Sequence, residues 1–143
     1  EIILHLKGWV QEMKRNDILN GELSKAVAGV GHTQYLVLCD AGLPIPTGVK
    51  MIDLSLVKGK PSLMEVLKAV SEEMVIESFI VASELEMVNS KFLGEIQEVL
   101  KGISYRTVEH EKFKELTKSS YTIVRTGECS SYANLILVGG VNF

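Results

Sequence analysis

Two histidines in the body of the chain stand among residues that can take part in proton transfer. His32 lies in the sequence Gly31-His32-Thr33, directly before an apolar run, and Asp40 follows that run. His110 lies between two glutamates. Imidazole has an ordinary pKa close to neutrality, so a histidine can both accept and donate a proton at physiological pH. Both histidines are therefore candidates for general acid and base catalysis.

The spacing of His32 and Asp40 argues against a simple pair within one chain. The run 35–39 predicts a buried strand, which would hold the two side chains at opposite ends, about 25 Å apart at about 3.3 Å per residue. They can meet only if the turn at Gly31 folds back or if two chains share a site. The alternative is that His32 is a surface residue at the end of a helix and that Asp40 forms the turn before Gly42.

His110 is not part of a recognisable zinc motif. A metalloprotease-type site needs a second histidine four residues later, and that position holds Lys114. Lys114 can share a helix face with His110, although a solvated charged helix is the alternative. Because no cysteine lies beside either histidine, we expect no metal site.

A polar loop, residues 125–134, provides a third group of candidate residues. It carries a phenol at Tyr132, an amide at Asn134 and several hydroxyls. Such groups can match the many donors and acceptors of a polyhydroxylated ligand when that ligand loses its water. A polar hairpin connection without a binding role is the alternative. Sequence motifs for dinucleotide binding, phosphate loops and serine hydrolases are absent.

The elements that must position these groups follow from hydrophobic periodicity. Short apolar runs alternate with amphipathic segments, which is typical of an α/β domain with a mostly parallel sheet, whose ligands bind beyond the carboxyl ends of strands. We predict strands at 35–39, 51–57, 75–82, 103–108, 121–124 and 135–138. We predict helices at 22–30 (capped by Asn20), at 61–73 (starting with Pro61), at 83–100 and at 109–118. The third of these would turn four glutamates outward, Glu84, Glu86, Glu95 and Glu98.

Composition excludes several classes of protein. The chain has 143 residues, with 15 Lys and Arg against 18 Asp and Glu, and its formal net charge of −3 argues against binding of bare nucleic acid. No apolar run reaches the roughly 18 to 20 residues that span a bilayer, which excludes a membrane role. Cys39 and Cys129 form no CxxC pair, which indicates reduced thiols in a cytoplasmic protein. A hydrophobic fraction of 46% is typical of one folded domain of this length.

The first residues are expected to stand apart from that domain. The chain begins without methionine, and its first methionine is Met13. The apolar stretch before it starts with an acid and lacks a basic leader, so it is a poor signal peptide. We therefore expect residues 1–12 to be an extension and residues 13–143 to form the domain.

Taken in order, the polar clusters occur in strings that resemble one family of small enzymes. The strings are GHTQYLVLCDAGLPIP (31–46), MIDLSLVKGKPSLMEVL (51–67), EHEKFKELT (109–117) and IVRTGECSSYANLILVGGVNF (123–143). They are similar to the D-ribose pyranase family, and the resemblance runs from Met13 to Phe143. The L-fucose mutarotase family shares the fold, but the GHT, AGLPIP and SYAN strings are closer to the ribose branch.

The resemblance implies a single layered α/β domain with a mostly parallel central sheet flanked by helices. It also implies an isomerase that interconverts the pyranose and furanose rings of D-ribose without a cofactor or metal. The family's general acid/base histidine falls on His32. Its substrate-binding positions fall on Asp40, His110, Tyr132, Ala133 and Asn134. Ser131 stands where a proline is expected before the tyrosine, which would change only the rigidity of the loop.

An assembly of pentameric rings stacked into decamers is also implied, in which a neighbouring chain completes each sugar site. Shared sites would resolve the separation of His32 and Asp40. The apolar end at Phe143 is a candidate interface, and docking of Phe143 in the chain's own core is the alternative. Two other functions stay open: anomer interconversion of the L-fucose mutarotase type, and a non-catalytic ribose-binding partner of the uptake system.

Overall fold

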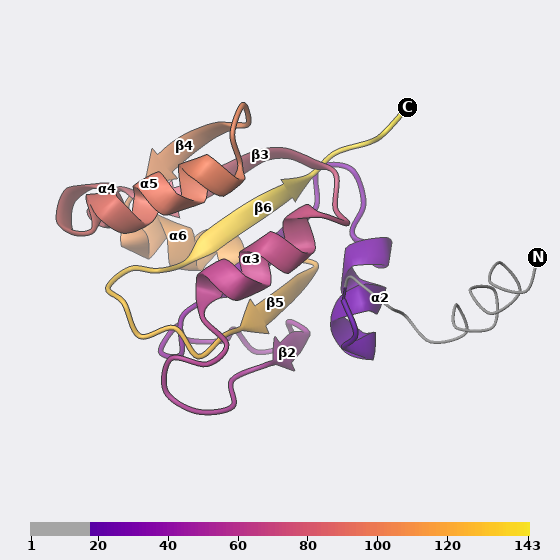
Figure 1. The fold of residues 1–143 in the computed structure, drawn as a ribbon, viewed down its shortest axis with the longest axis horizontal. Helices are drawn as coiled ribbons and strands as arrows, with labels where there is room; N and C mark the ends of the chain where they lie inside the picture. Colours follow the sequence, from indigo (N-terminus) through magenta and orange to yellow (C-terminus); the bar gives the residue numbers. More distant parts are fainter. Residues whose placement is uncertain (1–17) are drawn as a thin grey trace, which may run out of the picture.

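The computed structural model describes residues 18–143, and the expected extension, residues 1–12, lies outside the described residues. Figure 1 shows the order of the elements along the chain by colour. In that order they are α2 (Gly21–Gly29), β1 (Tyr35–Cys39), β2 (Met51–Asp53), α3 (Leu63–Ser71), β3 (Ile76–Ala82), α4 (Ser83–Val88), α5 (Ser90–Val99), β4 (Ser104–Val108), α6 (His110–Thr117), β5 (Thr122–Arg125) and β6 (Leu135–Gly139).

The strands form one sheet in the order β2-β5-β1-β6-β3-β4 (Figure 1). β5 pairs in parallel with β1 and β2, and β3 pairs in parallel with β4. β6 runs antiparallel to both of its neighbours, β1 and β3. The predicted α/β domain with a mostly parallel sheet is therefore confirmed. The reversal between β5 and β6 brings the polar loop 126–134 to the carboxyl end of β1, where Asp40 follows the strand.

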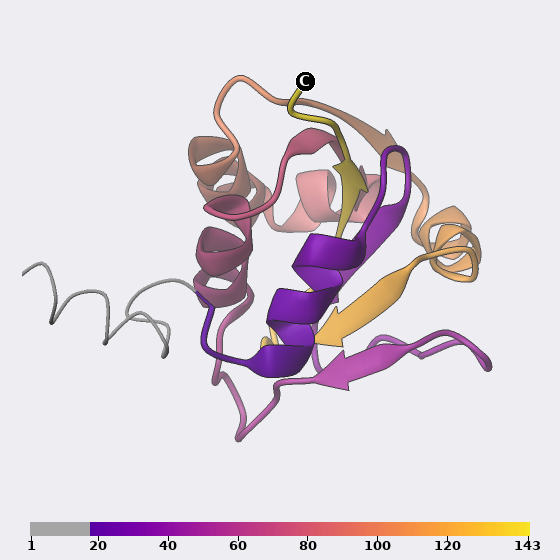
Figure 2. The same ribbon diagram turned by 90° about the vertical axis from the view of Figure 1, so that its right-hand side faces the viewer.

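Helices cover the two faces of the sheet unequally (Figure 2). α2, α3, α4 and α5 pack on one face, where Leu36 and Leu38 of β1 join the larger hydrophobic core. α6 covers the other face, where Val37 and Cys39 pack with Phe113 in a smaller core. β1 is thus buried on both faces, as expected for a central strand of a sheet with helices on both sides.

The predicted helix 83–100 is in fact two helices, α4 and α5. Asn89 interrupts them because it leaves the helical conformation, with φ −145° and ψ 50°. Its side-chain amide donates to the carbonyl of Ser131 at 3.3 Å. Asparagine favours such interruptions, since its side chain competes for backbone partners outside helices. The corner between α4 and α5 is thereby tied to loop 126–134.

The predicted strand 51–57 is shorter than expected: it ends at Asp53, and the chain reverses direction at 57–60. The N–H of Lys60 donates to the carbonyl of Val57 at 2.9 Å, which closes a tight turn. Gly59 occupies this turn with φ +85°, a conformation that glycine adopts without a steric penalty.

Two helix starts show how local sequence fixes the ends of elements. Asn20 caps α2 through its side-chain oxygen, as predicted. α3 begins at Leu63 rather than at Pro61, because Ser62 forms a reciprocal capping box that satisfies the first amides of the helix.

Candidate functional site

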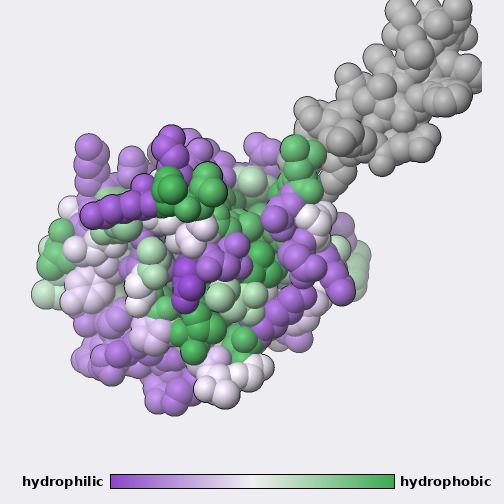
Figure 3. All heavy atoms as spheres, turned by 90° about the horizontal axis from the view of Figure 1, so that it is seen from below, coloured by the Kyte–Doolittle hydropathy of each residue, from purple (hydrophilic) through white to green (hydrophobic). Residues whose placement is uncertain are grey.

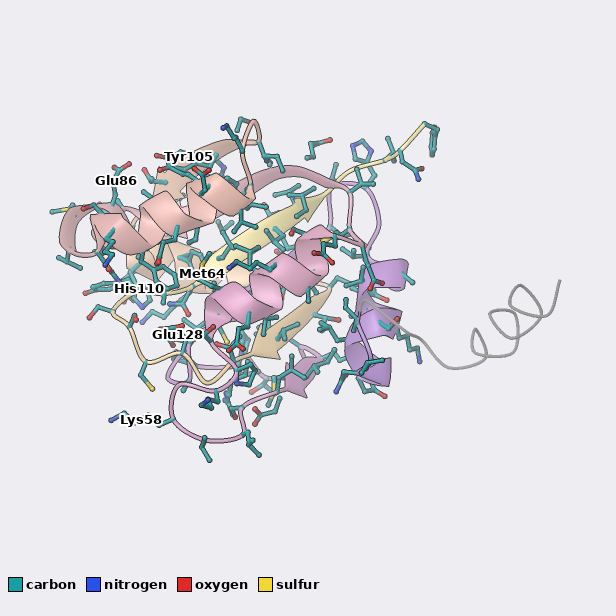
Figure 4. The ribbon with its side chains drawn as sticks, viewed as in Figure 1. Lys58, Met64, Glu86, Tyr105, His110 and Glu128 are labelled. Carbon is teal, nitrogen blue, oxygen red and sulfur yellow. The ribbon has the colours of Figure 1, made fainter. Side chains whose placement is uncertain are left out.

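A hollow of about 400 Å³ opens at the carboxyl ends of β1 and β5. Its walls come from the turn after β1, the first residue of α6 and the loop between β5 and β6. Residues on these walls include Asp40, His110, Glu128, Cys129, Tyr132 and Asn134. We call this hollow the polar pocket. Figure 4 shows His110 and Glu128 at this end of the molecule, and Figure 1 shows the C-terminus at the other.

Asp40 is held by the turn that follows β1. Its backbone N–H donates to Oδ1 of Asn134 at 2.8 Å, and its own Oδ1 accepts from the N–H of Gly42 at 3.0 Å. Partial burial raises the pKa of the Asp40 carboxyl above its ordinary value, against the opposing effects of hydrogen bonds from the turn and of nearby His110. Asp40 and Asn134 are thus in direct contact, although they are 94 residues apart in the sequence.

His110 is the first residue of α6, and the carboxylate of Glu84 fixes its position. The backbone N–H of His110 donates to both carboxylate oxygens of Glu84, at 3.0 and 3.2 Å. The prediction that Glu84 turns outward is therefore wrong, because its charge stabilises the N-terminus of α6. The imidazole lies edge-on to Tyr132, with ring centroids 5.1 Å apart. Its Nδ1 is buried and has no hydrogen-bond partner among the described residues.

Tyr132 and its neighbours shape the loop on the other wall. Tyr132 adopts a φ of 55°, which is uncommon for a residue with a large side chain. The N–H of Asn134 donates to the carbonyl of Tyr132 at 2.8 Å and closes the turn. Between them, Ala133 turns its side chain into the larger hydrophobic core. The turn therefore directs Tyr132 toward His110 while Asn134 reaches Asp40.

Glu128 anchors the same loop, and reasoning from the sequence did not single it out. Its carboxylate accepts from the N–H of Leu63, at the start of α3, at 3.0 Å and from the hydroxyl of Ser130 at 2.6 Å. Its carbonyl accepts from the N–H of Ala41 at 2.8 Å. Local sequence carries no signal for this role, because Leu63 is 65 residues away.

His32 lies at the opposite end of β1, in a turn that hydrogen bonds define closely. The N–H of Thr33 donates to the carbonyl of Gly139 at 2.8 Å, and the N–H of Gln34 donates to the carbonyl of Gly31 at 3.1 Å. Thr33 adopts a φ of 70° within this turn. The imidazole of His32 therefore projects from a turn that is fastened to the end of β6.

The structure does not bring His32 and Asp40 together within one chain. The two residues flank β1 and line different hollows. His32 instead shares a second hollow, of about 370 Å³, with Glu73 and the C-terminal residues. Phe143 is 101% exposed, so the alternative in which it docks in the chain's own core is wrong.

Other residues named from the sequence lie outside the polar pocket or at its rim. Lys114 pairs with Glu111 at 2.8 Å on the charged face of α6, as in the alternative reading of that helix. Burial raises the pKa of the Cys39 thiol to about 12, whereas Cys129 is exposed at the pocket. Across residues 18–143, no group of three or more potential metal ligands comes together and no helix is both long and apolar enough to cross a bilayer.

Comparison with known proteins relates the whole fold to one family. The model of the RbsD / FucU transport protein family matches residues 13–142. A D-ribose pyranase of Actinobacillus succinogenes is 49% identical over 139 residues, which cover 92% of this chain and 100% of that protein. A D-ribose pyranase of Bacillus cytotoxicus is 47% identical over 131 residues, with the same shares covered.

Solved structures agree with the relationship in sequence. Bacillus subtilis RbsD complexed with D-ribose matches with a TM-score of 0.87 at 41% identity, covering 92% of this chain and 100% of that one. The fucose mutarotase of Streptococcus pneumoniae in complex with L-fucose matches with a TM-score of 0.73 at 27% identity, covering 87% and 94%. By both measures this chain is more similar to the first protein than to the second.

Proposed function

Because the chain belongs to the RbsD / FucU transport protein family, we propose that it is a D-ribose pyranase, an isomerase that interconverts the pyranose and furanose rings of D-ribose. The observation that carries this proposal is the identity of 49%, over 92% of the chain, to a protein of that name. In the proposed reaction, side chains alone transfer the protons, without a cofactor or metal.

A neutral sugar fits the polar pocket better than a phosphorylated one does. Asp40 and Glu128 contribute carboxylates to its walls, and among the described residues that line it there is no lysine or arginine. A phosphate group would meet negative charge without a compensating cation. The same groups suit sugar hydroxyls, because a carboxylate accepts hydrogen bonds from them.

We assign substrate binding to Asp40, His110, Tyr132, Ala133 and Asn134. The place of His110 on the wall of the polar pocket supports this assignment, because an imidazole can hydrogen-bond a sugar hydroxyl. Asp40 supports it as well, since its raised pKa indicates a carboxylate that is partly removed from water. Ala133 contributes through the backbone of the turn, because its side chain is buried in the core.

We assign proton transfer to His32. In ring opening, its neutral imidazole takes the proton of the anomeric hydroxyl, and the bond between C1 and the ring oxygen breaks with its electron pair going to that oxygen. The imidazolium then protonates the former ring oxygen, which leaves the open-chain aldehyde. Closure through a different hydroxyl reverses these transfers and yields the other ring size. Positioned proton transfer of this kind typically contributes about 10²- to 10⁴-fold to the rate.

A neighbouring chain supplies His32 to each polar pocket in this proposal. Apolar side chains are exposed at both ends of the sheet: Leu56 (79%) and Met87 (78%) lie toward the pocket end, and Phe143 lies beside His32. Apolar surface also interrupts the hydrophilic surface in the view from below (Figure 3). Contacts between unlike ends form a closed ring when the rotation closes. The resemblance to the D-ribose pyranase family implies pentameric rings stacked into decamers, and we propose this assembly.

We propose the cytoplasm as the location of this enzyme. Cys39 and Cys129 are both free thiols, as is usual in a reducing compartment.

Saturation-transfer NMR with D-ribose and L-fucose tests the function directly. We expect the purified protein to accelerate exchange between the pyranose and furanose signals of ribose. Faster exchange of the fucose anomers without an effect on ribose would instead indicate a mutarotase. Binding of ribose without faster exchange would indicate a non-catalytic partner of ribose uptake, and either result would overturn the proposal.

His32→Gln is the matched variant for this experiment. We expect it to fold and assemble like the wild-type protein, because the His32 side chain is half exposed. Its ribose exchange should fall by about 10²- to 10⁴-fold. Wild-type exchange in this variant would remove His32 from the mechanism.

A further inference from the structure

A carboxylate contacts the imidazole of His32, and neither the sequence motifs nor the polar pocket accounts for it. Nε2 of His32 lies 2.8 Å from Oε1 of Glu77, and both side chains are 49% exposed. An ionised carboxylate only accepts hydrogen bonds. In the neutral imidazole the proton must therefore reside on Nε2, which leaves the lone pair of Nδ1 free to take a proton.

The backbone of β3 is irregular at the residue that makes this contact. Ile76 pairs with Gly139 and Ser78 pairs with Val138, so one step along β6 corresponds to two steps along β3. Glu77 is the extra residue of this β-bulge. Bulges bend a strand and redirect a side chain, and they are frequent beside active sites.

Two glycines let the three segments approach one another. A Cβ on Gly139 would collide with the carbonyl oxygen of Gly31, in the turn that carries His32. A Cβ on Gly140 would lie 3.3 Å from Cβ of Glu77, which is tighter than an ordinary contact. The Gly139-Gly140 pair thus allows the His32 turn and the β3 bulge to meet at the end of β6.

We propose that Glu77 is the positioning residue for His32. Its carboxylate fixes the ring orientation and the Nε2–H tautomer, so that Nδ1 exchanges protons with the sugar. It also stabilises the imidazolium that forms when Nδ1 takes the proton of the anomeric hydroxyl. This inference rests on the proposed role of His32 and adds a group that does not itself touch the substrate.

Glu77→Leu tests the proposal because it removes the acceptor while keeping a side chain of similar bulk. We expect the turnover number for ribose to fall by about 10- to 100-fold, with KM nearly unchanged because Glu77 lies outside the polar pocket. Glu77→Gln keeps an acceptor without the charge, so its turnover number should lie between those of Glu77→Leu and the wild type. It also replaces the leucine variant if that variant fails to assemble.

Glu73→Gln is the matched control. Glu73 lines the same hollow as His32, but its carboxylate accepts from the N–H of Ile18 rather than from the imidazole. Loss of negative charge at this end of the sheet is common to the Glu73 and Glu77 variants. We expect the control to exchange ribose at the wild-type rate.

The tautomer of His32 gives a readout that a merely structural role would not change. The chain has only 3 histidines, so long-range proton–nitrogen NMR spectra of histidine-labelled protein can be assigned with His32→Gln. Above the histidine pKa, the wild type should show His32 protonated on Nε2, and Glu77→Leu should show the mixture of a free histidine. Unchanged spectra, or wild-type turnover in Glu77→Leu, would overturn the proposal.

Failure of this inference can be told apart from failure of the proposed function. If the wild-type protein does not accelerate ribose exchange, the pyranase assignment fails and the tautomer spectra alone decide whether Glu77 orients His32. If His32→Gln loses exchange while Glu77→Leu keeps it, the function stands and the positioning role of Glu77 is wrong.

Discussion

The two ends of β1 hold their polar groups in different ways. At the carboxyl end, Asp40 and His110 are fixed by partners from distant segments, Asn134 and Glu84. At the amino end, His32 stands on an exposed turn and contacts the single carboxylate of Glu77. The first end is a walled pocket, and the second is an exposed turn that borders a separate hollow.

This difference fits the proposed separation of sugar binding from proton transfer. A pocket that binds many hydroxyls needs several groups held at fixed distances, which loops packed against strand ends provide. A proton-transfer group needs access to the sugar from the open side of the pocket. A projecting histidine can supply that access when the amino end of one chain meets the carboxyl end of another.

The largest expected effect comes from mixing two inactive variants. His32→Gln removes the proposed proton transfer and Asp40→Asn weakens ribose binding, so each protein alone should have little activity at ribose concentrations well below the wild-type KM. Random co-assembly of equal amounts should restore about one quarter of the sites, because an intact site then needs one intact end from each of two chains. Ribose exchange after unfolding and refolding of the mixture measures this recovery.

Recovery would fail if both ends served a site within one chain. The same two proteins mixed without unfolding provide the control, since each assembly then keeps subunits of one variant only. A mixture that regains no activity after verified co-assembly would contradict the shared site.

Asp40→Asn should weaken ribose binding by about 10- to 100-fold, the effect of about 1.5 to 3 kcal/mol for a hydrogen bond to a charged group. In contrast, the variant should be more stable than the wild type. Because folding raises the pKa of Asp40, the folded state disfavours the ionised form, and the amide should raise the free energy of unfolding at pH 7. Calorimetric titration and denaturant unfolding measure the two effects.

The pH dependence of ribose affinity and of stability should also differ between the wild type and Asp40→Asn. Ribose affinity of the wild type should fall on acidification as Asp40 takes a proton, at a pH above the usual range of an aspartate because its pKa is raised. Asp40→Asn should lack this loss. Its gain in stability should vanish below the ordinary aspartate pKa, where the carboxyl is protonated in both the folded and unfolded states. If the ribose affinities of the two proteins depended on pH in the same way, the binding role of Asp40 would be contradicted.

A smaller effect is expected for Glu84→Ala, which removes the carboxylate at the N-terminus of α6. We expect a loss of about 1 kcal/mol in the free energy of unfolding, as for other lost helix caps, and a modest rise in KM because His110 is less well held. Glu95→Ala is the control, since Glu95 is exposed on α5. Equal unfolding midpoints for the two variants would show that the contact with His110 contributes nothing.

The smallest effect concerns the two thiols. Cys129 is exposed at the polar pocket, whereas Cys39 is buried with a pKa near 12, so a thiol reagent should modify Cys129 alone in the folded protein. Saturating D-ribose should slow this reaction by covering the pocket. Mass spectrometry of the modified peptides measures it, with Cys129→Ser as the control. The same rate with and without ribose would place the sugar elsewhere.

Much of the fold followed from periodicity, because burial of alternate or helically spaced side chains is a local property. The run 35–39 became β1, and its continuous apolar pattern correctly predicted burial on both faces. The helix 83–100 was predicted as one piece because its apolar spacing continues past the interruption. Asn89 interrupts it by leaving the helical conformation, and its side-chain contact with Ser131 joins segments too far apart for a local pattern to record.

The site shows the same limit. Asp40, His110, Tyr132 and Asn134 were found from residue type and from family resemblance, and the sheet topology brings them to one pocket. The two carboxylates that fix the segments around the pocket were not predicted: Glu84 was expected to face solvent, and Glu128 had no predicted role. Each acts on a backbone N–H in another segment, so only the folded arrangement reveals it.

β6 sets a length constraint on any relative of this chain. Asn134, which contacts Asp40, directly precedes the strand, and Gly139, which binds the His32 turn, ends it. Removing two residues from β6 would preserve the alternation of its side chains but shorten the span by about 6.6 Å at about 3.3 Å per residue. In the proposed assembly, the His32 turn and the polar pocket would then no longer match those of the adjoining subunits. We therefore expect insertions and deletions to accumulate in the surface loops while the residue count of β6 stays fixed.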